Sequence, residues 1–246
     1  MAIDPYWLTL LLDIPSQGYQ AGCVFWQAAT GYRMSSHHGK HEQCATLAPP
    51  TGDAHLKIQR IEQGNFRVHL NLHVGDLDAA VSQAIAVGAG LITRQGYAVL
   101  RSPAGFTFCF VSGHGERTPT TPTTWGSHLS LPDQLAIDVE FDSWGREKTF
   151  WADLTGWPVT QSSRPEFARL VSPPSLPVRV LLHRLGTGST SGHIDIASSD
   201  RGAEVRRLSS LGAVVMGSGP TWTVMTGPDG STFCVTDRDP HTGLLP

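Results

Sequence analysis

The chain has 246 residues, of which 40% are hydrophobic and 16% charged, an ordinary composition for one large or two small globular domains. Its 18 basic and 21 acidic residues give a net charge of −3, which excludes a basic footprint, so we expect no nucleic-acid partner. No apolar run reaches the roughly 18–20 residues needed to cross a bilayer, and the start lacks the features of a signal peptide. The four cysteines form no CxxC pair, which favours buried thiols, a cytoplasmic location and no membrane association.

The first half of the chain predicts strands and helices in alternation. A helix over residues 23–30 ends at Gly31, and a short strand covers residues 55–61. A half-buried strand is predicted from alternate apolar positions, Leu70, Leu72 and Val74. Asp76 then occupies an N-cap position, and Gly88 ends the helix that follows. The apolar face of this helix is expected to consist of Leu77, Val81 and Ile85.

The second half repeats this order after a segment rich in Ser, Thr, Gly and Pro, residues 112–132, which predicts an extended linker. The strand after it should pack one face under the helices through Leu135, Ile137, Val139 and Phe141. Its opposite face then carries Ala136, Asp138 and Glu140. A helix over residues 146–155 ends at Gly156, and a strand covers residues 178–185. A second capped helix begins at Asp200 and presents Val205, Leu208 and Leu211 before Gly212.

These parallels amount to an internal repeat. His193 follows His69 by 124 positions, and Phe233 follows Phe108 by 125. Upstream, Phe25-Trp26 matches Phe150-Trp151, so both tryptophans are expected in the core. Each copy contains two modules of strand, helix and several short strands, which is an α+β class. We therefore expect domains at residues 1–113 and 132–246, with a linker over 114–131.

The repeated residues resemble the vicinal oxygen chelate superfamily, which includes glyoxalase I, extradiol dioxygenases and bleomycin-resistance proteins. The resemblance rests on two series: His69, Asp76, Gly88-Ala89, Pro103, Gly105 and Phe108-Cys109; then His193, Asp200, Gly212-Ala213, Pro228, Gly230 and Phe233-Cys234. It implies two tandem glyoxalase-like domains, each of two βαβββ modules forming a curved sheet cup. It says less about the reaction, because one fold hosts unrelated chemistries.

The resemblance also implies four metal-ligand positions in each cup. By position, they hold Thr9 or Ala136, Gln59 or His183, His69 or His193, and Cys109 or Cys234. The metal enzymes of the family carry Glu at the fourth position, and here both copies carry Cys. We therefore expect no metal cofactor. If a divalent metal such as Zn, Fe or Ni does bind, its expected ligands are His183, His193 and Cys234.

Strand alternation places several polar side chains on the faces expected to line the cups. The candidate catalytic residues are His193, Asp195 and Asp138, since imidazole and carboxylate groups suit acid–base chemistry. The candidate ligand-binding residues are His69, Asn71, His183, Arg179, Glu140, Trp222 and Tyr97. The structural alternatives are histidines satisfied by neighbouring strands, carboxylates paired with Arg179 or a histidine, and aromatic rings used for packing. The His37–His41 run predicts a solvated loop.

The sequence thus favours a protein that binds a small organic molecule in a β-sheet cup, that of the second copy, without a metal. The alternative is a metal-dependent lyase, isomerase or dioxygenase of the vicinal oxygen chelate type. A third possibility is that one copy only completes the other as a structural partner. The expected partner is a small-molecule ligand, and the expected assembly is a monomeric pseudo-dimer or a homodimer.

Overall fold

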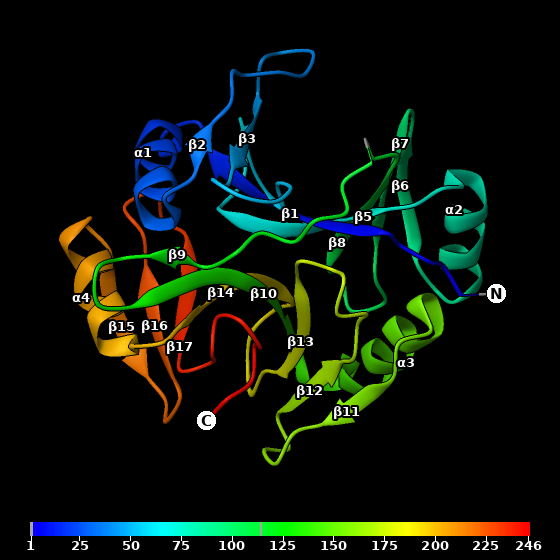
Figure 1. Ribbon diagram of the computed structural model, residues 1–246. Helices are drawn as coiled ribbons and strands as arrows, with labels where there is room; N and C mark the ends of the chain where they lie inside the picture. Colours follow the sequence, from blue (N-terminus) through cyan, green and yellow to red (C-terminus); the bar gives the residue numbers. More distant parts are fainter. Residues whose placement is uncertain (1, 114) are drawn as a thin grey trace. The chain divides into compact units, whose positions relative to one another are not determined.

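The computed structural model describes residues 2–113 and 115–246, and these form two open mixed sheets with four α-helices (Figure 1). The first copy contains β1 (Trp7–Pro15), α1 (Tyr19–Thr30), β2 (Arg33–Met34), β3 (Cys44–Ala48), β4 (Leu56–Ile61), β5 (Arg67–His73), α2 (Leu77–Ala86), β6 (Gly90–Arg94), β7 (Tyr97–Arg101) and β8 (Thr107–Val111). Its strand order is β2-β3-β4-β1-β5-β8-β7-β6.

The second copy repeats this order. It contains β10 (Leu129–Val139), a 3₁₀ turn (Phe141–Ser143), α3 (Trp144–Thr155), β11 (Val159–Gln161), β12 (Phe167–Leu170), β13 (Arg179–Arg184), β14 (Ser191–Ser198), α4 (Arg201–Ser210), β15 (Val214–Ser218), β16 (Trp222–Thr226) and β17 (Thr232–Thr236). The strand order, β11-β12-β13-β10-β14-β17-β16-β15, matches that of the first sheet strand for strand. The predicted tandem α+β fold is confirmed.

The described residues also divide into two compact units, and neither unit coincides with a copy. Unit 1 takes the described residues of Met1–Leu10, His69–Thr118 and Leu135–Gly192. Unit 2 takes Leu11–Val68, Pro119–Gln134 and His193–Pro246. Each unit therefore combines a half of one copy with a half of the other. Packing and sequence repetition divide this chain in two different ways.

The predicted helix ends are confirmed. The backbone N–H of Ala79 donates to the Asp76 side chain over 2.9 Å, and that of Ala203 donates to Asp200 over 2.8 Å, so both aspartates act as N-caps. Gly31 and Gly156 end α1 and α3 with φ of 73° and 71°, a left-handed conformation that glycine adopts without steric cost.

Three local predictions were wrong. Phe141 is 60% exposed, because β10 ends at Val139 and the chain turns into a 3₁₀ helix. Ile85 is 48% exposed, because the buried residues of the short α2 are Ala80, Val81 and Ala84. The linker is shorter than expected: β9 (Thr123–Thr124) pairs with β10, which begins at Leu129. Residue 114, within the predicted linker, lies outside the described residues.

Matched aromatic clusters form the core of each unit. In unit 1, Trp151 of α3 packs against Phe106, Phe108 and Phe150, and in unit 2, Trp26 of α1 packs against Phe25 and Phe233. Trp26 and Trp151 are fully buried, as predicted. None of the four cysteines forms a disulfide, and three of them are buried.

Both Trp151 and Trp26 donate the indole N–H to a buried carboxylate, but the two carboxylates come from different kinds of element. In unit 1, Glu147 of α3 accepts from Trp151 Nε1 over 2.8 Å and from the Ala104 N–H of the β7–β8 turn over 2.9 Å. In unit 2, Asp229 of the β16–β17 turn accepts from Trp26 Nε1 over 3.0 Å.

The repeat offset shows that the buried carboxylate stands on the helix in unit 1 and on the turn in unit 2. At an offset of 125, Glu147 matches Gly22, and Asp229 matches Ala104. A Cβ atom on Gly22 would lie 2.9 Å from Asp229 Oδ2, so a larger residue there would collide with the carboxylate. One carboxylate per unit therefore joins a helix to a turn contributed by the other copy.

Candidate functional site

A polar cluster forms in unit 2 on the parallel strands β14 and β17. Asp195 is paired with Cys234 across the ladder, and His193 precedes Asp195 by two positions, so its side chain shares that face. Donor atoms of these three residues lie within 4.8 Å of one another, and His193 Nε2 lies 3.4 Å from Asp195 Oδ1. The sequence predicted His193 and Asp195 as a site, and the structure brings them together.

The Asp195 carboxylate is held from several sides. Gln134 Nε2 donates to its Oδ2 over 2.6 Å, and Arg238 Nη1 lies 3.4 Å from the same oxygen. Arg238 also donates through Nη2 to Asp133, and all of these side chains are buried. Burial raises the pKa of Asp195, but the hydrogen bond and charge of His193, the charge of Arg238 and the Gln134 bond outweigh burial and hold that pKa below its ordinary value.

Sequence reasoning missed Asp133, Gln134 and Arg238. Pro132 suggested that the linker was still in progress, whereas β10 already begins at Leu129. The offset of 125 would have found Gln134, because it places that residue opposite Thr9, and Ala136 was therefore the wrong occupant of the first position. Arg238 lies beyond the last strand, where strand alternation gives no signal.

In unit 1, the candidates from β10 and β13 form a second polar group. His183 Nδ1 lies 2.8 Å from Asp138 Oδ1, the Ser191 hydroxyl donates to Asp138 over 3.4 Å, and the His183 ring stacks on Phe167. Arg179 is half-buried at the start of β13. Glu140 was expected on the strand, but it lies after the end of β10, and its carboxylate accepts a hydrogen bond from the Ser143 hydroxyl over 2.6 Å.

In the first copy, the positions that match His193, Asp195 and Cys234 hold no carboxylate. Asn71 pairs with Cys109 across β5 and β8, as Asp195 pairs with Cys234, and His69 precedes it by two positions. His69, Asn71 and Cys109 are all buried. Among the described residues, Asn71 Oδ1 has no hydrogen-bond partner. The first copy therefore keeps the histidine and the cysteine of the cluster but not its carboxylate.

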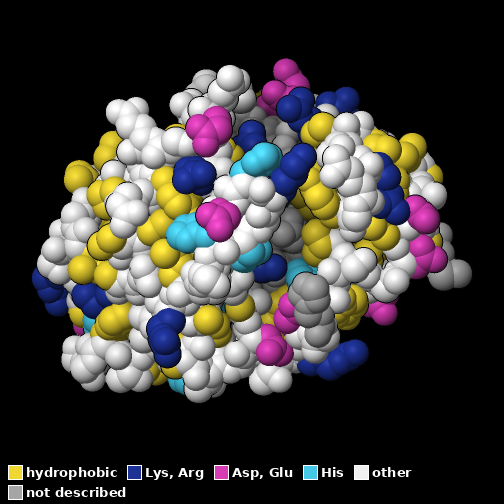
Figure 2. Space-filling model, turned by 90° about the horizontal axis from the view of Figure 1, so that it is seen from above, with side chains coloured by type: hydrophobic (Ala, Val, Ile, Leu, Met, Phe, Trp, Pro, Cys, Tyr) yellow, Lys and Arg dark blue, Asp and Glu magenta, His cyan; other side chains and the backbone are white. Residues whose placement is uncertain are grey.

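The two aromatic candidates lie at the starts of matched strands. Tyr97 and Trp222 open the matched strands β7 and β16; Tyr97 is 44% exposed and Trp222 is half-buried. The His37–His41 loop is exposed, as predicted, and His37 Nε2 lies 3.0 Å from the Tyr19 hydroxyl. The surface in Figure 2 shows acidic and basic side chains interspersed, without a continuous basic patch on that face.

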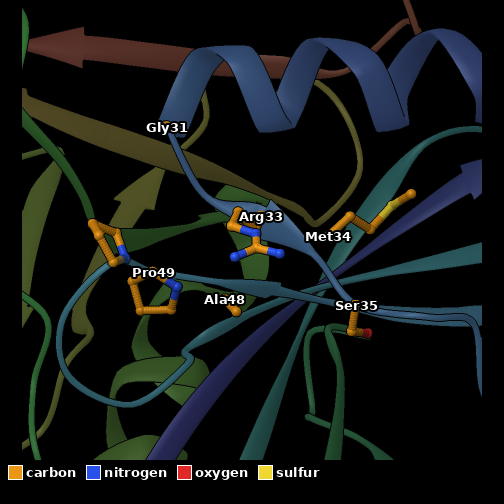
Figure 3. Close-up of a pocket in the computed structure, with 7 residues that line it drawn as sticks. Gly31, Arg33, Met34, Ser35, Ala48 and Pro49 are labelled. Atoms are coloured by element: carbon orange, nitrogen blue, oxygen red, sulfur yellow. The ribbon is translucent and has the colours of Figure 1, made fainter.

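A separate pocket of about 410 Å³ lies in unit 2 beside the short strand β2 (Figure 3). It is lined by Gly31, Arg33, Met34, Ser35, Ala48, Pro49 and Pro50. None of the predicted site residues lines it. Its one charged side chain, Arg33, is exposed, so the pocket lacks the buried polar groups that fix a ligand's orientation.

The donor set at His193, Asp195 and Cys234 does not suit a resident metal ion as arranged. Imidazole, carboxylate and thiolate are each acceptable to zinc. However, Asp195 already receives Gln134 and the Arg238 guanidinium, whose positive charge would lie beside a bound dication. The sequence named His183, His193 and Cys234 as the ligands of a metal, if one binds. Of these, His193 and Cys234 lie together, with Asp195 beside them, whereas His183 belongs to unit 1 and pairs with Asp138.

Comparison with protein families identifies a model described as a glyoxalase-like domain, which matches residues 9–111 and again residues 134–236. The two matches begin at Thr9 and Gln134, in agreement with the structural pairing of these positions. Comparison with curated proteins gives no match. No helix of the described residues is long and apolar enough to span a membrane.

Solved structures share the fold at low sequence identity. An Mn(II)-bound glyoxalase from Novosphingobium aromaticivorans superposes with a TM-score of 0.68 at 15% identity, covering 99% of this chain and 87% of the other. An extradiol ring-cleaving dioxygenase from B. fuscum gives 0.66 at 14%, covering 99% and 74%. The 2,2',3-trihydroxybiphenyl 1,2-dioxygenase of Sphingomonas wittichii strain RW1 gives 0.62 at 14%, covering 100% and 95%. These neighbours share the fold, and they include a glyoxalase and an extradiol ring-cleaving dioxygenase, as the resemblance in the sequence led us to expect.

Proposed function

We propose that this chain, which belongs to the glyoxalase-like domain family and contains that domain twice, binds a small polar organic molecule without a metal ion. The binding surface is the β-sheet cup of the second copy, with His193 and Asp195 as the principal contacts. The observation that carries the proposal is the buried, multiply hydrogen-bonded Asp195 carboxylate beside His193.

Burial of charged groups opposes folding unless each is paired, so such a cluster is seldom kept for packing alone. The first copy supports this reasoning, because it builds the same strand pair with a neutral Asn71 in place of Asp195. The His193 side chain is 15% exposed against 5% for Asp195, so a ligand meets the imidazole first.

The ionised Asp195 also tunes its neighbour. A carboxylate beside an imidazole fixes the orientation of the ring. His193 can therefore present a ring nitrogen to a ligand as a hydrogen-bond donor or as a proton acceptor. Trp222, which also belongs to unit 2, stays in the proposal as a further ligand contact. The candidates that belong to unit 1 stay as candidate contacts of that unit, considered by itself: His69, Asn71, Tyr97, Asp138, Glu140, Arg179 and His183.

One observation favours a second function, a metal-dependent lyase, isomerase or dioxygenase. Donor atoms of His193, Asp195 and Cys234 lie within 4.8 Å of one another, and a shift of the Arg238 side chain would release the carboxylate for zinc. The two functions make opposite predictions for a protein kept in chelator.

The test is a ligand screen by thermal shift in the presence of EDTA, using small organic acids, amines and phenols. The proposal expects at least one class to raise the melting temperature, with at least a tenfold loss of affinity in His193→Ala. His69→Ala, at the matched position of the first copy, is the control and should leave the affinity of the His193–Asp195 site unchanged. Ligand binding that requires added metal would replace the proposal with the metal-dependent alternative.

A further inference from the structure

The polar cluster of unit 2 contains a cation of its own. Arg238 follows β17, is 6% exposed and lies between two buried carboxylates, donating to Asp133 and lying 3.4 Å from Asp195 Oδ2. Among the described residues, its Nε has no hydrogen-bond partner. A buried guanidinium with an unsatisfied N–H is costly, so packing alone explains this placement poorly.

We infer that Arg238 is a protein-supplied cation that takes the place of a metal ion at the His193, Asp195 and Cys234 cluster. This inference rests on the metal-free function proposed above and explains it. Two carboxylates and one guanidinium leave the cluster with one net negative charge. Without Arg238, the Asp195 carboxylate would stand beside an imidazole and a thiol, a donor set that attracts borderline-soft divalent ions such as Zn²⁺ or Co²⁺. The second buried carboxylate, Asp133, would add uncompensated negative charge beside it.

The first copy supplies an internal comparison. At offsets of 124 to 125, Arg238 matches Gly113, Asp133 matches Leu8, and Asp195 matches Asn71. The histidine and cysteine are present in both copies, as His69 with Cys109 and His193 with Cys234. The guanidinium and its two carboxylates are therefore present together in the second copy and absent together from the first, as expected if the three groups act together.

The geometry also leaves no place for both cations. A metal bound through Asp195 would lie beside the Arg238 guanidinium in a site shielded from water, where repulsion between positive charges is strong. Removal of the arginine should therefore convert the cluster into a metal site in which Cys234 is a ligand.

The experiment titrates Co²⁺ into the full chain and records the thiolate-to-cobalt charge-transfer absorption. Arg238→Gln should bind Co²⁺ at least about 100-fold more tightly than the parent, and Cys234→Ser in that background should abolish the band. Arg67→Gln is the matched control, because Arg67 pairs with a different buried carboxylate, Asp13, over 2.6 Å. That control should bind no more Co²⁺ than the parent does.

A second variant covers the case in which Arg238→Gln fails to fold. Arg238→Met combined with Asp133→Leu removes one full charge pair, copies Leu8 of the first copy and keeps Asp195. It should give the same Cys234-dependent band and should be stabilised by Zn²⁺ in thermal unfolding. Arg238→Lys keeps the charge and should exclude the metal.

Two results would overturn the inference. Folded variants without Arg238 that bind no Co²⁺ would show that the arginine does not exclude a metal, and the ligand-binding proposal would then stand unaffected. A parent protein that already gives the Cys234-dependent band at the affinity of the variants would refute the inference and the metal-free clause of the proposed function together.

Discussion

Removal of the Glu147 carboxylate should destabilise the protein strongly, although Glu147 lies in none of the candidate sites. The carboxylate accepts hydrogen bonds from Trp151 Nε1 and the Ala104 N–H, and it is completely buried. Glu147→Ala leaves both donors unsatisfied inside the core of unit 1. At about 1–3 kcal/mol for each orphaned donor, offset by the cost of burying the carboxylate in the parent, the net loss is about 2–4 kcal/mol. For a chain of this size, that corresponds to roughly 4–16 °C in Tm.

The assay is thermal unfolding followed by circular dichroism, with a rescue variant that copies unit 2. Glu147→Gly combined with Ala104→Asp moves the acid from the helix to the turn, as Gly22 and Asp229 do. Because burial raises the pKa of Glu147, the contribution of this side chain to the free energy of unfolding is greatest below its ordinary pKa of 4.5 and declines as pH rises. Glu147→Ala melting within 1 °C of the parent, or a rescue variant no more stable than the single mutant, would refute the exchange of carboxylates.

Three further predictions concern other elements. Burial lowers the pKa of His55 to about 4, from an ordinary value of 6.5, despite the 2.8 Å hydrogen bond between its ring and the Pro132 carbonyl. Because the unfolded chain then binds a proton that the folded chain does not, the free energy of unfolding should fall by up to about 3 kcal/mol between pH 6.5 and 4. Urea titrations would measure this fall, and His55→Gln should flatten it. Arg207 donates hydrogen bonds to the Ala28 and Ala29 carbonyls and to the buried Glu204 carboxylate. Arg207→Met should therefore lower the free energy of unfolding in urea by about 3–5 kcal/mol, whereas Arg206→Met, at an exposed neighbour, should change it by no more than about 0.5 kcal/mol. Equal effects of the two variants would contradict this. Residues 1–113 or 132–246 expressed alone should fail to give a folded monomer by size-exclusion chromatography and NMR, since both compact units draw on both copies; a folded monomeric copy would overturn that view.

The sequence was most informative where one residue has one structural role. The capping aspartates, the glycines that end helices and the repeated Phe-Cys strand were all placed correctly, since each follows from local geometry or from a constant offset. The repeat also indicated two glyoxalase-like domains, because two kinds of element kept the same spacing in both copies.

Predictions failed where the outcome depends on distant partners. Phe141 continues an apolar alternation, but the chain turns before reaching it. Arg238 reaches Asp133 from more than a hundred positions away, and Gln134 follows a proline within the strand, so neither gives a local signal. The pairing of halves from different copies depends on tertiary packing and left only a faint trace, the exchange of Gly22 and Asp229 for Glu147 and Ala104.

The most direct test of the metal-free binding site is native mass spectrometry with elemental analysis on untagged protein purified without chelator. The account predicts less than a tenth of an equivalent of zinc, iron, manganese or nickel. It also predicts that any retained organic molecule is lost in His193→Ala and Asp195→Asn but kept in His69→Ala. About one equivalent of a transition metal in the parent, absent from His193→Ala, would contradict the account and establish the metal-dependent alternative.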